Sequence, residues 1–234
     1  MRKNCVSKAL FWGIALSFGT SALMAENLRP AATNETVSVQ IENPSFEPSG
    51  ASDEVVTDFS KVPGWTNAGL IPGVKPWKEL FTTAVVFKWY WLVSGKAVDA
   101  NYALYVQGYS RQVWQTLKET VRDNSTYTVS INVLRDKWKD AEKTKFQIQL
   151  VTFNGEQGDF SNATVLAEQE FSNISQDNFQ TCTMTYTPKA EHVGKPITVC
   201  LRSYYERPSA TSKDLAWKDT GVSVDKISMT CETK

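Results

Sequence analysis

The stretch Tyr127-Thr-Val-Ser-Ile-Asn-Val133 alternates apolar and polar residues without interruption. Side chains of an extended chain point alternately to two faces, so every second residue of this stretch shares a face. The residues on the apolar face are Tyr127, Val129, Ile131 and Val133. This period is typical of a β-strand with one face in a hydrophobic core and the other in water.

The same period of two recurs along the chain. It is found in segments 37–41, 146–150, 182–186 and 197–201, with turn-rich spacers between them. A last segment, Gly221–Thr230, changes its phase at Asp225-Lys226, which indicates a β-bulge or bend. No helical period persists and no internal repeat is present. We therefore predict an all-β fold of about eight or nine antiparallel strands, a single-domain β-sandwich of the jelly-roll type.

The N-terminal residues have the features of an export signal. Arg2, Lys3 and Lys8 precede an apolar run, Ala9–Phe18, that is too short to cross a bilayer as a helix. Small residues follow it, with possible cleavage after Ala22 or Ala25. We expect residues 1–25 to be a signal peptide and residues 26–234 to form the exported jelly-roll domain, without a membrane segment after cleavage.

Charge argues against polyanionic partners. The 234 residues include 25 basic and 25 acidic ones, and cleavage of the expected signal peptide would remove only basic ones. The remaining chain is mildly acidic and has no basic run. We therefore expect neither nucleic acid nor an anionic membrane as a partner.

Three cysteines remain after the expected cleavage: Cys182, Cys200 and Cys231. By strand parity Cys182 and Cys231 share a face with the apolar residues of their own strands, whereas Cys200 points the other way. The direction of these side chains slightly favours a Cys182–Cys231 disulfide, and three unpaired thiols are an equally open alternative. The single histidine, His192, lies in a polar loop, where we expect it to be solvated. A Ser-His-Asp or Cys-His enzyme is not indicated.

Aromatic residues are concentrated between Trp77 and Trp114, which hold ten of the chain's 27. The densest run is Phe87-Lys-Trp-Tyr-Trp91. A sheet core could use these rings for packing. Trp and Tyr are also common where a ligand is held, because they combine apolar area with a polar tip and a negative π face. Both interpretations stay open.

Four motifs appear in a fixed order along the chain. They are Glu42-Asn-Pro-Ser-Phe-Glu47, Val62-Pro-Gly-Trp65, the Thr185–Val199 segment and Val222-Ser-Val-Asp-Lys-Ile-Ser228. Together they resemble the jelly-roll modules of the galactose-binding-like and carbohydrate-binding type. In such modules a structural calcium ion ties the exit of the first strand to the last strand.

By position, this resemblance implies that Glu47 and Asp225 are Ca²⁺ ligands. Asp99 is expected as a third ligand, and Glu42 is an outside candidate. The chemistry is consistent, because calcium prefers hard carboxylate and carbonyl oxygens. The alternative is that these acids are solvated turn residues.

Within that fold, the size, the signal peptide, the aromatic content and the Ser212-Lys-Asp-Leu-Ala-Trp217 segment resemble the Stig cyclases. These are exported, calcium-dependent enzymes that make hapalindole-type indole alkaloids. The resemblance implies a small hydrophobic indole-terpenoid substrate, a geranylated isocyanovinyl indolenine. It would undergo an acid-promoted Cope rearrangement, an aza-Prins cyclisation and quenching of the cation to a hapalindole or fischerindole product.

The resemblance also implies the site residues. Asp214 and Tyr102 are expected in the catalytic site, with Asp214 as the acid that protonates the indolenine nitrogen. Trp89, Tyr90 and Trp138 are expected to bind substrate. The family has an aromatic residue at the Trp138 position that shapes the second ring closure, so a tryptophan there leaves the product identity open.

This chemistry needs no redox cofactor and no nucleophile. It needs one proton donor, a pocket that folds the terpene tail, and ring faces that stabilise carbocations. The apolar residues 215–217 after Asp214 could raise the pKa of that carboxyl, whereas Lys213 and Lys218 would act in the opposite sense. A loop acid paired with one of these lysines is the structural alternative.

Two further expectations complete the sequence analysis. The alternative function is a non-catalytic carbohydrate-binding module that stacks sugars on Trp89, Tyr90 and Trp91. A glycosidase is not indicated, because no pair of carboxyls at a set separation stands out. We also expect a homodimer, because a flat face rich in aromatic residues would otherwise be exposed to water.

Overall fold

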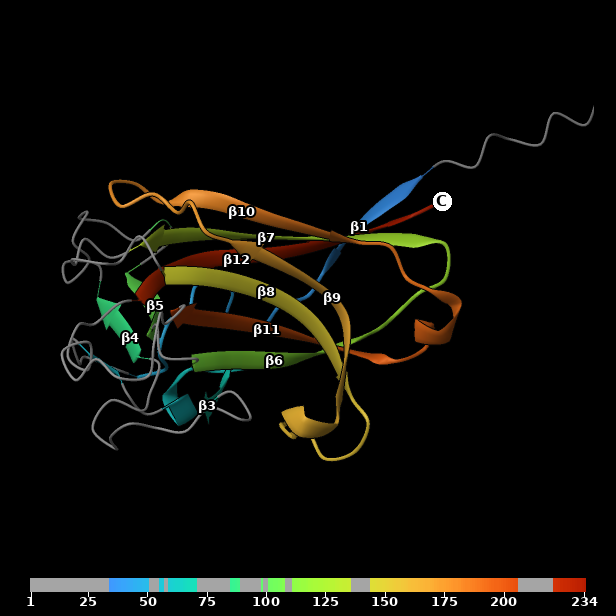
Figure 1. The fold of residues 1–234 in the computed structure, drawn as a ribbon, viewed down its shortest axis with the longest axis horizontal. Helices are drawn as coiled ribbons and strands as arrows, with labels where there is room; N and C mark the ends of the chain where they lie inside the picture. The colour runs from blue at the N-terminus through green and yellow to red at the C-terminus, as the bar shows by residue number, and fades with distance from the viewer. Residues whose placement is uncertain are drawn as a thin grey trace, which may run out of the picture. The chain divides into compact units, whose positions relative to one another are not determined.

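Two antiparallel β-sheets face each other in this computed structural model (Figure 1). It describes residues 34–50, 55–56, 59–70, 85–88, 98, 101–107, 111–135, 144–205 and 221–234. These residues belong to one compact unit, Asn34–Lys234. The expected signal peptide, residues 1–25, lies outside the described residues. The expected all-β antiparallel sandwich is confirmed.

Twelve strands and three 3₁₀ turns make up the described fold. The strands are β1 (Glu35–Val39), β2 (Val55–Val56), β3 (Thr66–Leu70), β4 (Val85–Lys88), β5 (Tyr102–Gln107), β6 (Arg111–Thr120), β7 (Ser125–Arg135), β8 (Thr144–Phe153), β9 (Ala163–Phe171), β10 (Gln180–Tyr186), β11 (Pro196–Tyr205) and β12 (Gly221–Thr233). The turns are η1 (Phe59–Lys61), η5 (Phe160–Asn162) and η6 (Ala190–His192). No helix among the described residues is long and apolar enough to cross a membrane.

The seven-stranded sheet has the order β10-β7-β12-β5-β4-β2, with β1 also paired to β12. The five-stranded sheet has the order β3-β6-β11-β8-β9. Neighbours in both sheets are antiparallel, and most of them are distant in the sequence. These crossovers are what a sandwich requires, because consecutive strands are shared between its two layers.

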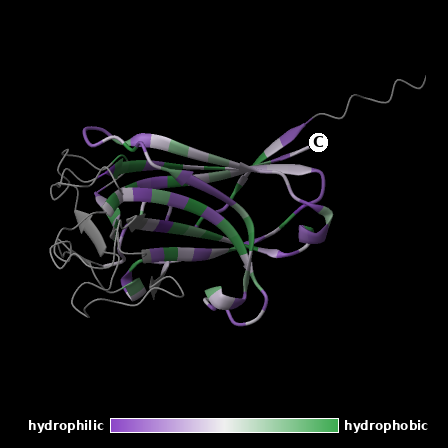
Figure 2. Ribbon diagram, in the orientation of Figure 1, coloured by the Kyte–Doolittle hydropathy of each residue, from purple (hydrophilic) through white to green (hydrophobic). Residues whose placement is uncertain are grey.

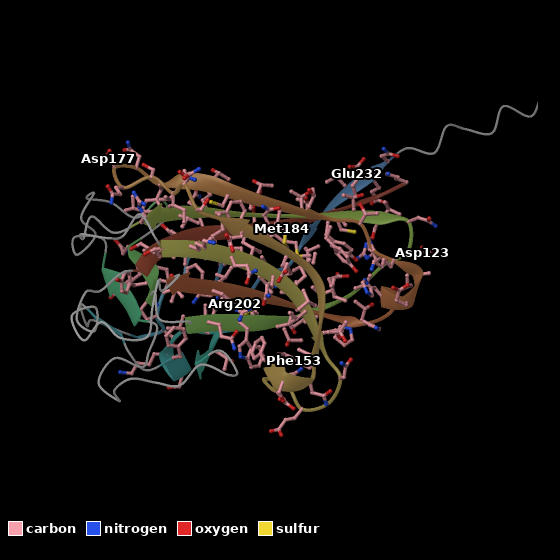
Figure 3. The ribbon with its side chains drawn as sticks, in the orientation of Figure 1. Asp123, Phe153, Asp177, Met184, Arg202 and Glu232 are labelled. Carbon is pink, nitrogen blue, oxygen red and sulfur yellow. The ribbon has the colours of Figure 1, made fainter. Side chains whose placement is uncertain are left out.

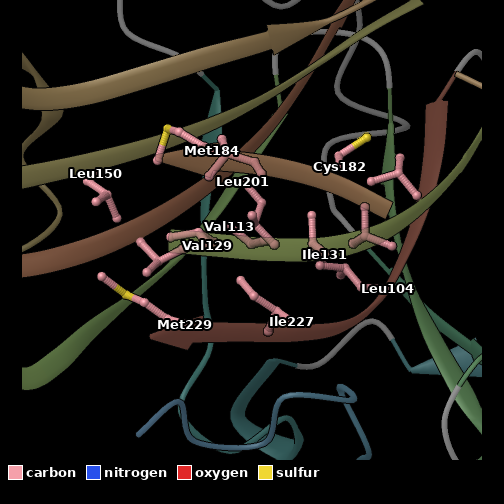
Figure 4. Close-up of a cluster of buried hydrophobic side chains, with 14 of the residues drawn as sticks. Leu104, Val113, Val129, Ile131, Leu150, Cys182, Met184, Leu201, Ile227 and Met229 are labelled. Atoms are coloured by element: carbon pink, nitrogen blue, oxygen red, sulfur yellow. The ribbon is translucent and has the colours of Figure 1, made fainter. Parts of the chain in front are cut away.

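The core lies between the sheets, and the alternation around Tyr127–Val133 builds one wall of it. The four apolar side chains of that stretch are at most 1% exposed. Phe146, Ile148 and Leu150 of β8 are fully buried on the opposing sheet. Figure 4 shows side chains of both sheets pointing toward one another, including Val129, Met184 and Met229 from one and Val113, Leu150 and Leu201 from the other. Each such aliphatic residue contributes about 1.5–3 kcal/mol when fully buried.

The phase change in the last strand is a β-bulge, as the sequence predicts. The register of β12 against β7 shifts between Asp225 and Ser228, and Lys226 has a φ of 50°. The bulge turns Ile227 and Met229 inward on the same side as Val222 and Val224, so all four are buried. It also places Asp225 at a bend in the chain.

The outer faces of the two sheets differ in exposure. Thr181, Thr183 and Thr185 on the outer face of β10 are exposed to solvent. On the outer face of the five-stranded sheet, Gln112 is 1% exposed and Cys200 is fully buried. The alternating colours along β8 show a period of two in the five-stranded sheet as well (Figure 2). Sequence period alone therefore does not reveal that one outer face is covered.

The structure decides the alternative left open for the cysteines and corrects the expectation for His192. Cys182, Cys200 and Cys231 are all free and buried, so the favoured Cys182–Cys231 bridge is absent and the alternative of three thiols holds. His192 is 6% exposed rather than solvated, and its Nδ1 lies 2.8 Å from the hydroxyl of Tyr186. The η6 turn directs the imidazole inward, where the phenol of the core-facing Tyr186 supplies its hydrogen bond.

Candidate functional site

The loop that follows β1 is shaped by hydrogen bonds of Asn43. Its side-chain oxygen accepts from the backbone N–H of Glu47 at 2.8 Å, and its side-chain amide donates to the Glu47 carbonyl at 2.9 Å. Asn43 and Phe46 have positive φ values of 48° and 58°. Asn tolerates this region because its short side chain can bond to nearby backbone. The result is a tight loop that presents the carboxylate of Glu47.

The Val62-Pro-Gly-Trp65 turn packs against this loop. Trp65 is 3% exposed, and its indole N–H donates to the carbonyl of Asn43 at 3.0 Å. Its ring packs on Phe46 with centroids 4.8 Å apart. The side chain of Gln115 bonds both the N–H and the carbonyl of Glu42 at 2.9 Å. Glu42 itself is exposed.

Glu47 and Asp225 both bind the short segment that leads into β5. Oε1 of Glu47 accepts from the backbone N–H groups of Asn101 and Tyr102, at 2.9 and 2.8 Å. Oδ2 of Asp225 accepts from the N–H of Val98 at 2.6 Å. Two acids that are far apart in the sequence therefore converge on one segment.

Asp225 is fully buried at the bulge of β12. Its second oxygen, Oδ1, accepts from the N–H of Lys226 at 2.7 Å. The next residue, Ile227, donates its N–H to the carbonyl of Pro44 at 2.9 Å. The bulge therefore ties the last strand directly to the loop after the first strand.

Asp225 is not a solvated turn acid, because its carboxylate is fully buried and both of its oxygens accept hydrogen bonds. A buried carboxylate is costly unless donors or a cation compensate its charge. The expected third ligand, Asp99, falls between Val98 and Asn101, whose N–H groups bond to Asp225 and Glu47. Asp99 itself lies outside the described residues. Among the described residues, no group of three or more His, Cys, Asp or Glu side chains is gathered. Glu47 and Asp225 are the residues present that would hold the ion.

Of the expected substrate-site residues, the structure describes Tyr102 alone. Tyr102 is 5% exposed, begins β5 and belongs to the hydrophobic core. Trp89, Tyr90, Trp138 and Asp214 lie outside the described residues.

Trp138 and Asp214 belong to two connections between strands, and the strands that flank these connections end side by side. Arg135, the last residue of β7, pairs with Val222 near the start of β12. Thr144, the first residue of β8, pairs with Tyr205, the last residue of β11. The connections that carry Trp138 and Asp214 therefore leave from neighbouring strand ends.

Two hydroxyl groups are buried at this end of the five-stranded sheet. Thr144 and Ser203 are both fully buried. Within the described part of the chain, neither hydroxyl has a hydrogen-bond partner. Buried hydroxyl groups without a hydrogen-bond partner are rare in a closed core. At this end of the sheet, Thr144 and Ser203 could therefore form hydrogen bonds with a polar group of a ligand.

The sequence does not reveal that the backbone N–H groups of residues 98, 101 and 102 bind Glu47 and Asp225, because a backbone donor has no sequence signature. The role of Asn43 could have been suspected from its position before Pro44, since Asn-Pro favours a turn.

Comparison with known proteins gives one family and a set of related structures. The family model described as HpiC1-like, HpiC1 cyclase, matches residues 37–230. Comparison with curated protein sequences found no match.

Among solved structures, the Stig cyclase Fisc from Fischerella sp. TAU, in complex with (3Z)-3-(1-methyl-2-pyrrolidinylidene)-3H-indole, superposes with a TM-score of 0.60. The two are 21% identical over 85% of this chain and 99% of that one. A cyclase from Fischerella sp. TAU gives 0.60 at 20% identity, over 86% of this chain and 100% of that one. An apo-form cyclase from Fischerella sp. gives 0.58 at 18% identity, over 85% and 98%. These likenesses establish the shared β-sandwich fold.

Proposed function

The chain belongs to the HpiC1-like cyclase family, and we propose that it is a calcium-dependent cyclase of indole alkaloid biosynthesis. Its substrate would be a geranylated isocyanovinyl indolenine. The reaction would be an acid-promoted Cope rearrangement followed by aza-Prins cyclisation and cation quenching. The product would be a hapalindole- or fischerindole-type alkaloid.

The observation that carries this proposal is the family match over residues 37–230, which includes every expected site residue. The sandwich supports it by bringing together the strand ends that flank Trp138 and Asp214. The Cope step needs no bond to the protein. It needs the two ends of a flexible diene held close together, which can contribute several kcal/mol through lost freedom.

Asp214 would supply the proton to the indolenine nitrogen, and it would take a proton back when the cation is quenched by proton loss. Tyr102, Trp89, Tyr90 and Trp138 would line the pocket. Each ring face stabilises a nearby cation by about 0.5–2 kcal/mol. Trp138 would border the last ring closure and so influence which product forms.

Calcium would have a structural role in this proposal. Glu47, Asp225 and Asp99 would hold the ion, supported by the hydrogen bonds of Glu47 and Asp225 to the segment 98–102. The ion would neutralise these carboxylates. The segment that carries Asp99 would then be fixed at the start of β5, where Tyr102 stands. We further propose export after cleavage of residues 1–25, and a homodimer.

The test is incubation of the purified mature protein with the indolenine substrate, with excess calcium or with a chelator. Products are identified by mass spectrometry and NMR, and oligomeric state is read by light scattering. We expect conversion with calcium and strongly reduced conversion with the chelator. Asp214→Asn should lose most turnover, whereas Asp123→Asn, in the exposed turn before β7, should keep it. A folded protein that binds simple glycans and converts no substrate would overturn the proposal.

A further inference from the structure

Strand β10 is an open edge of the seven-stranded sheet. Within the described part of the chain it pairs with β7 alone, from Gln180 to Tyr186 and without a register shift. No backbone hydrogen bond outside that pairing reaches residues 180–186 there. In an antiparallel pair every second residue turns its N–H and C=O away from the neighbouring strand. A row of backbone donors and acceptors therefore lies along the outer side of β10 (Figure 1).

The other edge strands of the described structure have features that hinder pairing with a second chain. β9 carries Glu168 and Glu170 and has a register shift against β8. β3 has a register shift against β6, β2 has only two residues, and β1 has five and begins with Glu35. Charges, bulges and short length are the means by which proteins keep edge strands from pairing with other chains. β10 has none of them, because its seven residues are uncharged and regularly paired.

The two faces of β10 differ in what they offer to a further strand. The exposed residues of its outer face are Thr181, Thr183 and Thr185. On the core side Cys182 and Met184 are only 2% and 3% exposed, and Figure 3 labels Met184. The hydroxyl groups of Thr183 and Ser130 lie 3.1 Å apart across β10 and β7. Threonine favours strands, and Thr–Thr and Thr–Ser pairs directly opposite each other stabilise sheets, so the outer face of β10 is suited to one more strand.

The sequence of β10 is complementary to itself about Thr183. If two copies pair antiparallel with a two-fold axis at Thr183, the two Thr183 residues lie opposite each other. Thr181 of each copy then lies opposite Thr185 of the other, which gives three Thr–Thr pairs on the outer face. On the core side Cys182 lies opposite Met184. A two-fold interface repeats each of its pairs, and none of these pairs brings like charges together.

The charges beyond the two ends of β10 fit the same symmetry. The charged residues nearest to the strand in the sequence are Asp177, three positions before Gln180, and Lys189, three positions after Tyr186. Both are exposed. In the two-fold arrangement the beginning of one β10 lies beside the end of the other, so Asp177 of each copy comes to the same end as Lys189 of the other. Opposite charges are therefore brought together at both ends, whereas a parallel pair would bring like charges together.

We propose that β10 is a dimerisation edge whose partner is β10 of a second copy of this chain. The two strands pair antiparallel about Thr183, and the two seven-stranded sheets join into one continuous sheet. This inference rests on the homodimer of the proposed function and specifies its contact surface. It uses no residue of the Glu47–Asp225 cluster or of the expected substrate site.

Cross-linking tests the register of the two strands. Directly opposite residues of an antiparallel pair have Cα atoms about 4.5–5.5 Å apart, a separation that a disulfide can bridge. The purified mature variant Thr183→Cys should therefore form a covalent dimer under mild oxidation, seen as a band of doubled mass on a non-reducing gel. The native thiols are buried and should stay unreacted. The matched control is Ser228→Cys, which is exposed in the same row of the outer face but lies on β12, and it should give no such band.

A charge at the same position tests the affinity. Thr183→Lys places two like charges opposite each other at the two-fold axis, and Thr183 is exposed in the single chain, so the fold should not be affected. Light scattering over a range of protein concentrations should give a dimer for the parent and for the control Ser228→Lys. The dissociation constant should rise about tenfold or more for Thr183→Lys. At a concentration where the parent is monomeric, the melting temperatures of Thr183→Lys and the parent should agree.

Two outcomes would overturn the proposal. The first is a parent protein that stays monomeric at all concentrations. The second is a dimer that persists in Thr183→Lys and leaves Thr183→Cys without a cross-link, which would mean that the dimer uses another surface. Neither measurement uses the indolenine substrate. A monomer that converts the substrate would leave the cyclase proposal standing, and a cross-linked dimer that converts nothing would leave this proposal standing, so the two can fail separately.

Discussion

Tyr102 donates its backbone N–H to Oε1 of Glu47 at 2.8 Å. This bond joins the loop after the first strand to the first residue of β5. By resemblance of sequence, Glu47 is expected to bind calcium and Tyr102 to belong to the catalytic site. Because of this contact, a change at Glu47 would act directly on the position of Tyr102.

Glu47→Gln tests the charge of this carboxylate apart from its shape. A glutamine oxygen can still accept from Asn101 and Tyr102, so we expect a loss of only about 1 kcal/mol in the free energy of unfolding without calcium. The rise in melting temperature on adding calcium should be much smaller than in the parent. Thermal melts with calcium and with chelator measure both. Glu156→Gln, on an exposed turn, is the control, and an undiminished calcium response would exclude Glu47 as a ligand.

Asp225→Asn should be more damaging. The two oxygens of Asp225 accept from different N–H groups, those of Val98 and Lys226. Asparagine has one acceptor oxygen, so its NH₂ group would face a donor in a fully buried position. We expect a loss of about 1–3 kcal/mol in stability even without calcium, together with loss of the calcium response. Urea unfolding followed by tryptophan fluorescence measures the free energy of unfolding. If Asp225→Asn were as stable as Glu47→Gln, this reasoning would be contradicted.

Gly64→Ala and Gly194→Ala form a matched pair at the same φ of 80°. At Gly64 an added Cβ would lie 2.5 Å from Nε2 of Gln115 and 2.7 Å from Cβ of Glu42, whereas at Gly194 it would meet nothing within 4 Å. Both changes cost about 1 kcal/mol for the left-handed backbone. Gly64→Ala should lose about 1–3 kcal/mol more because it overpacks the support of the Glu47 loop. Equal melting temperatures for the two variants would show that the loop relaxes freely.

Stability should fall at alkaline pH. Burial raises the pKa of the Cys200 thiol from 9.0 to about 12, and burial together with nearby Tyr127 and Glu191 raises that of Tyr186 from 10.0 to about 12. Both groups stay protonated longer in the folded protein than in the unfolded chain. Their contribution is therefore complete below about pH 9 and is lost as pH rises toward 12. Unfolding free energies across this range should decline less steeply for Cys200→Ala, and an unchanged slope would contradict the assignment.

The Tyr186–His192 pair should behave as a unit. Its hydrogen bond of 2.8 Å is buried, so Tyr186→Phe leaves the imidazole nitrogen without a partner and should cost about 1–3 kcal/mol. His192→Leu should cost a similar amount. The double variant should be more stable than the sum of the two losses predicts, because neither polar group is then left alone. Chemical unfolding of all four proteins gives the coupling energy, and strict additivity would argue against the bond.

Sequence pattern predicted the strands that have regular alternation and missed those that do not. The notable omissions are β6 and β9. In β6 the core-facing positions include Gln115 between Val113 and Leu117, because that glutamine supports Glu42 rather than filling the core. In β9 most side chains are exposed or half-buried, since it is the edge strand of its sheet. A period of two is visible only where one face is uniformly apolar.

The sequence predicts only the part of the candidate site that has a local pattern in the chain. The bulge at Asp225 is visible as a local phase change, and Glu47 stands in a motif that follows the first strand. The donors that these acids bind are backbone groups of another segment, and the covered outer face of the five-stranded sheet is not visible in the sequence. His192 was expected in water because its neighbours in the chain are polar, whereas its partner is the inward-facing Tyr186.

The amino-acid sequence by itself determined the class of fold, the bulge in the last strand and the acids available to a metal ion. These follow from local alternation and from the side chains themselves. Only the tertiary structure decided that Glu47 and Asp225 bind the same segment, that all three cysteines stay unpaired, and that Gln112 and Cys200 share one covered face. Those relations join residues that are distant in the chain, such as Val98 and Asp225. They arise from the pairing order of the sheets, which no local pattern specifies.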